Sequence, residues 1–209
     1  MLKLHFARNT VSAATAIALH EAGLDFELVP VDFANAAQTK PPFLALNPKG
    51  RVPVLETPEG PLTETGALLE WVAAQAPHAG LVPDDAFQAA KMREMMCYLG
   101  STMHINHAHG MRGARWADDP AAHAAMAAKV NENMIACCAY VEPRLAGPYV
   151  LGDGFSLADP YLFTVCTWLP GDHVDITQFP KLAAHHTVMK ARRSVQTAHA
   201  QGFLKEFAL

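Results

Sequence analysis

The first 96 residues of this 209-residue chain contain no cysteine. The four cysteines come later, and none belongs to a C-x-x-C pair; they are Cys97, Cys137, Cys138 and Cys166. In a chain with no evident export segment this pattern predicts reduced, mostly buried thiols rather than a disulfide framework. It also implies that the first part of the chain performs no chemistry with a thiol of its own.

Charged residues and long apolar runs are also scarce. Charged residues make up 17% of the chain, the net charge is −4, and lysine and arginine form no block. Neither nucleic acid nor a membrane surface is therefore an expected partner. No apolar run approaches the ~20 residues of a membrane span. The opening MLKLHF is too short for a signal peptide, so we expect a cytoplasmic protein.

What is present in the first 31 residues is a strand, a helix and a second strand. Residues 2–6 alternate as a strand does, and residues 12–21 form an alanine-rich helix that Gly23 is placed to end. Residues 26–31 predict another strand, and Pro30 marks it as an edge or a strand end. This order implies a right-handed parallel crossover.

Residues 47–72 predict a loop, two short strands joined by a turn, and the start of a helix. Pro53 suits the first residue of a strand because proline cannot donate to a ladder. The helix begins at Glu64-Thr65. A helix start offers unpaired N–H groups and a positive dipole end, which together favour a carboxylate. The segment therefore suits a small acidic ligand lying along an exposed backbone edge.

The second part of the chain predicts helices alone. We expect a first domain at residues 1–77, a linker at 78–85 and an all-helical domain at 86–209. Ser156 and Asp159 fit a capping box at a helix start. The expected helices of this domain cover residues 86–115, 120–145, 180–193 and 195–207.

These segments resemble the soluble glutathione transferases, and bacterial beta-like members most of all. In that family an NPxGxVP loop with a cis-proline precedes a Glu-Ser or Asp-Ser pair; here the loop is NPKGRVP and the pair is Glu64-Thr65. The FSLADPYL segment resembles the one that nucleates the family's helical domain. The resemblance covers nearly the whole chain. It implies a thioredoxin-like domain (βαβ-ββα) followed by an all-helical transferase domain.

The resemblance also implies glutathione as co-substrate, with no metal or other cofactor. Val52 would pair its backbone with the cysteinyl amide of glutathione like an added strand, and Pro53 would set that geometry. Glu64 and Thr65 would hold the γ-glutamyl end. Two cations, Lys49 and Arg51, could meet the glycyl carboxylate; the alternative is that each is a solvated loop cation.

A thiolate-stabilising group is expected in the loop of residues 7–12. Beta-like relatives often place a cysteine there, followed by a serine; Val11 occupies the cysteine position and Ser12 the serine position. Ser12 is the first candidate to donate a hydrogen bond to the thiol, with Thr10 and Asn9 behind it. The alternative is that Ser12 only caps the first helix, since serine is a preferred N-cap.

In the second domain, His104 matches the histidine that the family's Glu-Leu-His-Lys segment brings near the sulfur. Ile105 replaces the lysine. A packing role for His104 remains open. His104, His107 and His109 invite a metal interpretation, but no carboxylate or thiol nearby completes the set, so no metal is expected. Weaker candidates for an electrophile pocket are Phe6, Arg8, Met103, His107, Met111 and Trp116.

The function implied by the resemblance is that of a detoxifying transferase. It would bind glutathione, stabilise its thiolate and promote attack on a hydrophobic electrophile or a peroxide, as a homodimer. One alternative is a glutathione-dependent disulfide or dehydroascorbate-type reductase, which the cysteine-free first domain disfavours in its protein-thiol form. Another is a non-catalytic, transferase-like binding protein.

Overall fold

The computed structural model describes residues 1–205. They divide into two compact units, residues 1–83 with residues 190–205, and residues 84–189. The C-terminal segment therefore belongs to the first unit, whereas the sequence pattern placed it in the helical domain.

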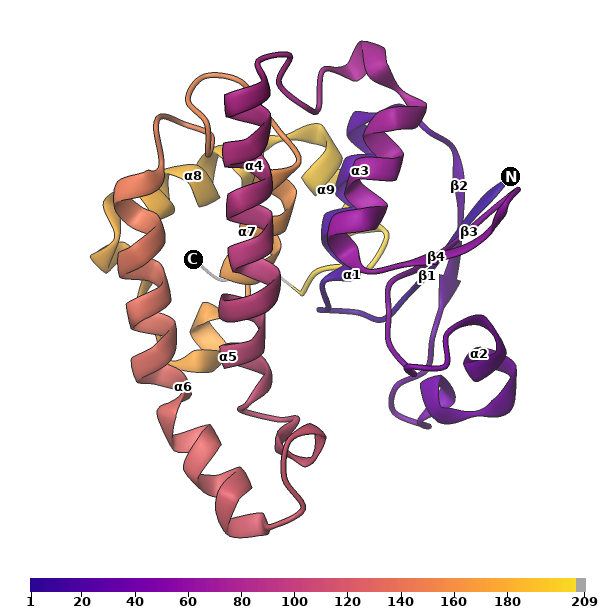
Figure 1. Cartoon of the computed structure of the whole chain (residues 1–209), viewed down its shortest axis with the longest axis vertical. Coiled ribbons are helices and arrows are strands. Elements are labelled where there is room, and N and C mark those ends of the chain that lie inside the picture. Colours follow the sequence, from indigo (N-terminus) through magenta and orange to yellow (C-terminus); the bar gives the residue numbers. More distant parts are fainter. Residues whose placement is uncertain (206–209) are drawn as a thin grey trace. The chain divides into compact units, whose positions relative to one another are not determined.

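A mixed four-stranded sheet forms the centre of the first unit (Figure 1). The strand order is β2-β1-β3-β4. β1 runs parallel to β2 and antiparallel to β3, and β3 pairs antiparallel with β4. This is the thioredoxin-like arrangement that the sequence predicted. The strands are β1 Leu2–Phe6, β2 Phe26–Pro30, β3 Val54–Thr57 and β4 Gly60–Thr63.

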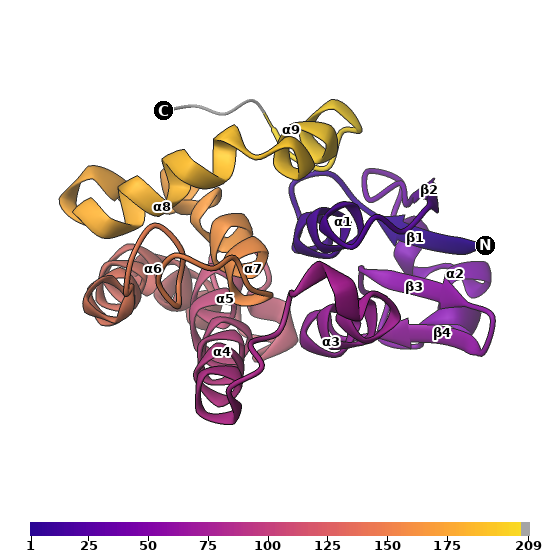
Figure 2. The ribbon, with the colours of Figure 1, turned by 90° about the horizontal axis from the view of Figure 1, so that it is seen from above.

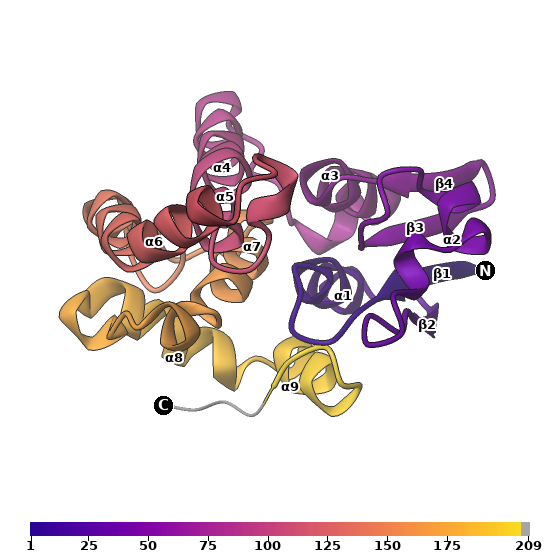
Figure 3. The same ribbon diagram turned by 90° about the horizontal axis from the view of Figure 1, so that it is seen from below.

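Helices cover both faces of this sheet. α1 (Ser12–Glu21) and α3 (Thr65–Gln75) lie side by side on one face, and α2 (Pro41–Leu46) lies on the other (Figures 2 and 3). Strand alternation explains the division. Leu4 and Leu55 are paired and fully buried, whereas Phe43 of α2 packs with Val54 on the opposite face.

The helix α1 is buried along most of its length. Every residue from Ser12 to Leu19 is buried, and four of these eight are alanines. Small side chains allow close approach to α3 and to the sheet. Gly23 ends the helix with φ +66°, while Leu24 N–H donates to the Leu19 carbonyl at 3.0 Å. This Schellman-type ending confirms the predicted role of Gly23.

The C-terminal helix α9 (Arg193–Ala200) packs against α1 in the same unit (Figure 2). Val195 and Ala198 are its fully buried apolar residues. The chain that follows reaches the other end of α1, where the Phe203 carbonyl accepts the Asn9 N–H at 2.8 Å. The Phe203 ring packs against the ring of Phe6, with 4.0 Å between their centroids and a tilt of 30°. The C-terminal segment thus holds the loop between β1 and α1.

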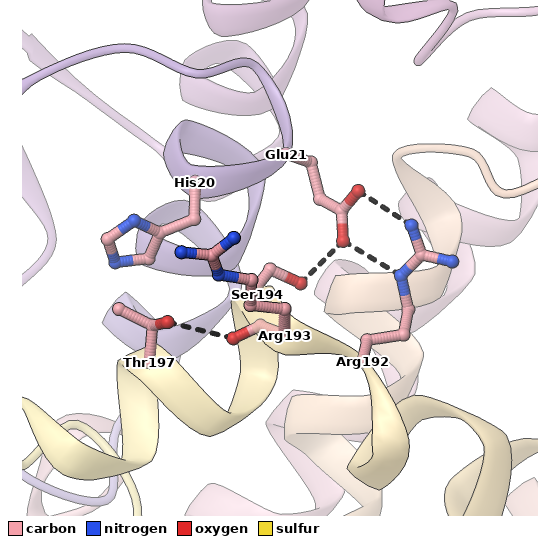
Figure 4. Close-up of a pocket in the computed structure, with 6 residues that line it drawn as sticks. All are labelled: His20, Glu21, Arg192, Arg193, Ser194 and Thr197. Carbon is pink, nitrogen blue, oxygen red and sulfur yellow. Dashed lines mark hydrogen bonds and ion pairs between the residues drawn. The ribbon is translucent and has the colours of Figure 1, made fainter.

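A polar cavity of about 600 Å³ opens beside the joint between α1 and α9 (Figure 4). The Glu21 carboxylate accepts from Arg192 Nε at 2.8 Å, from Arg192 Nη2 at 2.6 Å and from the Ser194 hydroxyl. The charges of Glu21 and Arg192 are therefore matched to each other. Its lining residues are His20, Glu21, Arg192, Arg193, Ser194 and Thr197.

These partners also set the ionisation of Glu21. Burial favours the neutral acid, but the hydrogen bonds from Arg192 and Ser194, with the charge of Arg192, outweigh it and lower the pKa of Glu21. The pair therefore stabilises the unit in its ionised form.

The second unit consists of helices. α7 is buried at all nine positions and lies among α4, α6 and α8 (Figures 2 and 3). No described helix has the length and apolar character that crossing a membrane requires. The helices are α4 Ala86–Tyr98, a π-helical turn Leu99–Met103, α5 His104–Ala108, α6 Pro120–Val141, α7 Ala158–Cys166 and α8 Pro180–Ala191. Shorter 3-10 turns in the two units cover Ala37–Thr39, Pro77–Ala79, Gly113–Arg115, Glu142–Arg144, Leu169–Asp172 and Ile176–Gln178.

Several helix limits differ from the sequence prediction. The helix expected over residues 86–115 ends at Ala108, just before Gly110 and a turn. α6 stops before Pro143, which lacks the N–H that a longer helix needs. The last helix ends at Ala200, ahead of Gly202 with φ +86°, and the predicted end at Phe207 lies outside the described residues. The short α2 was not predicted.

The predicted capping box is half formed. The Asp159 carboxylate accepts the Ser156 N–H at 2.7 Å, as a capping box requires, but the Ser156 hydroxyl donates to that carboxylate instead of receiving a helix N–H. Asp159 also accepts from Val150 N–H at 2.8 Å and lies 3.0 Å from His185 Nε2. Asp159 and His185 are fully buried.

We expect Asp159→Ala to lower the free energy of unfolding by about 3 to 5 kcal/mol, because it leaves His185 and two N–H groups buried without an acceptor. Urea unfolding of the full chain measures the loss, with the exposed Asp153→Ala as the control. A loss equal to that of the control would contradict the role given to this carboxylate.

We expect Glu21→Gln to lower the free energy of unfolding by roughly 1 kcal/mol at neutral pH, since both partners are partly exposed. The folded-state pKa lies below the unfolded value, so the contribution is complete above the unfolded pKa. It is lost as the pH falls through the folded pKa. Unfolding curves of wild type and variant should therefore converge in acid. A difference in stability between wild type and variant that persists in acid would contradict this assignment. An equal loss of stability in the exposed Glu27→Gln control would contradict it as well.

Candidate active site

The loop between β1 and α1 places two hydroxyl groups together. Thr10 Oγ1 donates to the Ala7 carbonyl at 2.7 Å and lies 2.9 Å from Ser12 Oγ. Asn9 supports the turn with φ +58°, a conformation that asparagine tolerates better than most residues. Ser12 is fully buried, whereas Thr10 is partly exposed. The more accessible hydroxyl of the pair is therefore that of Thr10.

The structure does not support the alternative that Ser12 caps α1. The N-cap residue is Val11, and its side chain makes no capping bond. Ser12 is the first helical residue, and its recorded hydrogen bonds join it to Thr10. Ser12 is thus available as a partner of the Thr10 hydroxyl.

The loop before β3 is held by a buried asparagine. Asn47 Nδ2 donates to the Arg51 carbonyl at 2.7 Å, and Asn47 Oδ1 accepts the Lys49 N–H at 3.2 Å. The next peptide bond along the loop, Val52-Pro53, is cis, as predicted. Among the described residues, no hydrogen bond to the backbone N–H or C=O of Val52 is found. This backbone edge is open to a further strand-like partner.

The start of α3 gathers a carboxylate, an ammonium and a hydroxyl. Glu64 precedes the helix with φ +71° and its side chain is 71% exposed. Lys49 Nζ lies 2.5 Å from Glu64 Oε1 and donates to Thr63 Oγ1 at 2.8 Å. Thr65 is buried as the first residue of the helix. The structure thus brings Lys49 to the Glu64-Thr65 pair, while the side chain of Arg51 is exposed.

In the second unit, two histidines on one face of α5 contact one indole. The Trp168 ring lies 4.9 Å from the ring of His104 and 4.5 Å from the ring of His107. His107 Nδ1 lies 2.9 and 2.8 Å from the two carboxylate oxygens of Asp172. Sequence reasoning did not single out Trp168 or Asp172, because 65 residues separate Asp172 from His107 and no local motif links them.

The residues suggested for an electrophile pocket differ in their burial and belong to both units. Phe6 packs against Phe203 inside the first unit, and Met103 is fully buried in the second. Met111 and Trp116 are exposed in the second unit, where Trp116 makes an edge contact with His109. The remaining two candidates are the exposed Arg8 and the partly exposed His107.

The cysteines are free thiols, as predicted, and three of the four are buried. Burial raises the pKa of the Cys138 thiol to about 12, with a further contribution from Cys137. Burial likewise raises the pKa of Cys166. Cys97 is the exposed one. Among the described residues no group of three or more histidine, cysteine or acidic side chains is arranged to hold a metal ion.

Comparison with known proteins shows the family of the chain. Residues 1–74 match the family model for the glutathione S-transferase N-terminal domain, and residues 107–200 match a model for the C-terminal domain. The chain is 29% identical to glutathione S-transferase GstA of Escherichia coli O157:H7 over 208 residues, 98% of this chain and 100% of the relative. It is 31% identical to a maleylpyruvate isomerase of Ralstonia sp over 190 residues, 88% of this chain and 89% of the relative.

A crystal structure of a glutathione transferase homologue from Sulfitobacter, with bound glutathione, superposes with a TM-score of 0.96. The two sequences are 55% identical, over 98% of this chain and 99% of that one. Together with the two domain matches and the thioredoxin-like sheet, this shows that the chain belongs to the glutathione S-transferase family.

Proposed function

We propose that this protein is a glutathione transferase that binds glutathione in its first unit, stabilises the thiolate, and promotes its attack on a hydrophobic electrophile or a peroxide. The observation that carries the proposal is the hydroxyl pair of Thr10 and Ser12 at the start of α1. Family membership and the glutathione bound to the Sulfitobacter homologue support the choice of ligand.

The γ-glutamyl end of glutathione carries an ammonium and a carboxylate, and the start of α3 offers a partner for each. The Glu64 carboxylate is exposed and suits the ammonium. The Thr65 hydroxyl, the first N–H groups of α3 and the nearby Lys49 suit the carboxylate. In this proposal Lys49 acts at the glutamyl end, and Arg51 alone remains for the glycyl carboxylate.

The peptide part of glutathione would lie along Val52. A peptide that adds to an open backbone edge gains hydrogen bonds in the manner of an extra strand. The unpaired N–H and C=O of Val52 and the buried Pro53 fit this mode. The cysteinyl residue would then extend from this edge.

We assign the hydrogen bond to the glutathione thiol to Thr10. Ser12 supports this contact by its hydrogen bond to Thr10. The Thr10 hydroxyl, which now donates to Ala7, would turn its hydrogen to the thiolate, and Ser12 would donate to Thr10 Oγ1. Lowering a thiol pKa by about 2 units takes ~2.7 kcal/mol. A hydrogen bond to a charged group contributes about 1.5 to 3 kcal/mol, and a helix N-terminus adds about 0.3 to 1 kcal/mol. These contributions are of the required size.

Other functions of the same scaffold are distinguished by their chemistry. A reductase acting through its own thiol is disfavoured, because the first unit lacks cysteine and three of the four cysteines in the second are buried. The second candidate is a glutathione-dependent isomerase, which the 31% identity to a maleylpyruvate isomerase supports. It would use the same thiolate on an unsaturated acid instead of an apolar electrophile. Glutathione binding without ionisation would indicate a carrier.

We also propose that the second unit supplies the electrophile-side residues, and that the protein is a cytoplasmic homodimer. The low charged fraction and the high apolar fraction are consistent with a buried interface. A monomer in sedimentation at micromolar concentration would contradict the proposed dimer.

Titration with glutathione, followed by the ultraviolet absorbance of the thiolate, tests the thiol assignment. We expect Thr10→Val to raise the pKa of the bound thiol by about 1 to 2 units, because it removes the direct donor. Ser12→Ala should raise it less, and Thr10→Ser should preserve it. A larger effect from Ser12→Ala would make Ser12 the direct donor. Unchanged ionisation in both variants would contradict the assignment of this loop.

Calorimetric titration tests the glutamyl site separately. We expect Glu64→Gln to weaken glutathione binding by roughly 10- to 100-fold, because a charged hydrogen bond to the ligand's ammonium is lost. Glu59→Gln, in the exposed turn between β3 and β4, is the matched control. Equal affinities of the two variants would place the γ-glutamyl end elsewhere.

A further inference from the structure

The cavity beside α1 and α9 has the size of a small-molecule site and an unusual lining. Its volume of about 600 Å³ lies within the range of about 300 to 1,000 Å³ that ligand pockets occupy. Its six lining residues all belong to the first unit, and each has a polar side chain (Figure 4). Ligand pockets are usually lined mainly by hydrophobic and aromatic side chains. This lining therefore selects a polar ligand.

One of the cavity's charges is not balanced. Burial raises the pKa of Glu21, but the hydrogen bonds from Arg192 and Ser194 and the charge of Arg192 lower it overall, so that the carboxylate is ionised. Glu21 and Arg192 then neutralise each other. The Arg193 guanidinium has no ion pair or hydrogen bond among residues 1–205, and its side chain extends from α9 toward α1 (Figure 4). An anion in the cavity would balance this charge.

The two hydroxyl groups of the cavity have already used their hydrogens. The Ser194 hydroxyl donates to Glu21 Oε1, and Thr197 Oγ1 donates to the Arg193 carbonyl at 2.8 Å (Figure 4). A hydroxyl group has one hydrogen to donate and two lone pairs that accept. Each oxygen can therefore still accept a hydrogen bond from a ligand. A ligand that has hydroxyl groups of its own meets this requirement.

The wall that His20 contributes is fixed without a ligand. Its Nε2 lies 2.8 Å from Gln201 Oε1, and its ring packs against that of Phe26 with 5.1 Å between the centroids. The opposite wall is held by the ion pair of Glu21 and Arg192. A site that is already ordered loses less conformational freedom when a ligand binds, which favours affinity.

We propose that this cavity binds a small anion that also carries hydroxyl groups, such as a sugar phosphate or a hydroxy acid. The Arg193 guanidinium would donate to the anionic group, because its fork of N–H groups matches two oxygens of a phosphate or a carboxylate. The hydroxyl groups of the ligand would donate to Thr197 Oγ1 and Ser194 Oγ. The lining includes none of the residues assigned to glutathione, so the inference does not depend on the proposed function.

Calorimetric titration of the full chain tests the site with four probes. Glucose 6-phosphate and gluconate are anions with hydroxyl groups, whereas inorganic phosphate lacks the sugar hydroxyls and glucose lacks the charge. We expect each hydroxylated anion to bind more tightly than inorganic phosphate and glucose do. The tighter of the two hydroxylated anions shows whether the anionic group is a phosphate or a carboxylate.

Variants of α9 locate the site. We expect Arg193→Gln to weaken the binding of the hydroxylated anions by roughly 10- to 100-fold, because a hydrogen bond between charged groups is lost. Arg112→Gln makes the same change of charge at an exposed arginine of the second unit and should leave their affinity unchanged. Thr197→Val should weaken the same anions by about 2- to 10-fold and leave inorganic phosphate unaffected. Thr197→Ser should preserve the affinity.

Four results would overturn the proposal. The first is that neither hydroxylated anion binds at millimolar concentration, and the second is that Arg193→Gln binds them as tightly as wild type does. The third is that inorganic phosphate or glucose binds as tightly as the hydroxylated anions, since one of the two recognised features would then be irrelevant. The fourth is displacement of the bound anion by glutathione, which would place it in the candidate active site instead.

Discussion

The close burial of α1 is the constraint on which the first unit depends. A helix surrounded by a sheet and two other helices has no solvent-facing side along most of its length. Its central residues are therefore alanines, a threonine and two larger aliphatic residues. Because the helix cannot shift without disturbing all of its neighbours, both of its ends are fixed in space. One end carries the loop of Thr10 and Ser12, and the other meets Arg192 and Ser194 through Glu21.

The sequence predicted the first unit well because its signals are local. The alternating residues of β1, the glycine after α1 and the proline at the start of β3 each act within a few residues of their own position. The helix start at Glu64-Thr65 was predicted for the same reason. The pairing of Lys49 with Glu64 was not predicted, because it depends on how the loop held by Asn47 folds back on the end of β4.

Contacts between distant residues explain most of what the sequence did not reveal. Asp172 contacts His107 only because the fold brings the turn after α7 to α5. Neither segment carries a sequence motif that predicts this contact. The predicted helix limits were wrong for a different reason. Alanine and methionine favour helix throughout residues 86–115, but Gly110 and Gly113 lie in the turn that follows α5. The grouping of α9 with the first unit likewise depends on tertiary packing on α1.

The first unit is discontinuous along the chain, and this has a consequence for its synthesis. The carbonyl that fixes Asn9 belongs to Phe203, almost at the opposite end of the polypeptide. When the ribosome has synthesised the four strands and the first three helices of this unit, its last helix has not yet been made. The whole of the second unit must emerge first. Domains usually fold in the order in which they are made. Here the synthesis of the first unit begins before that of the second unit but is completed after it.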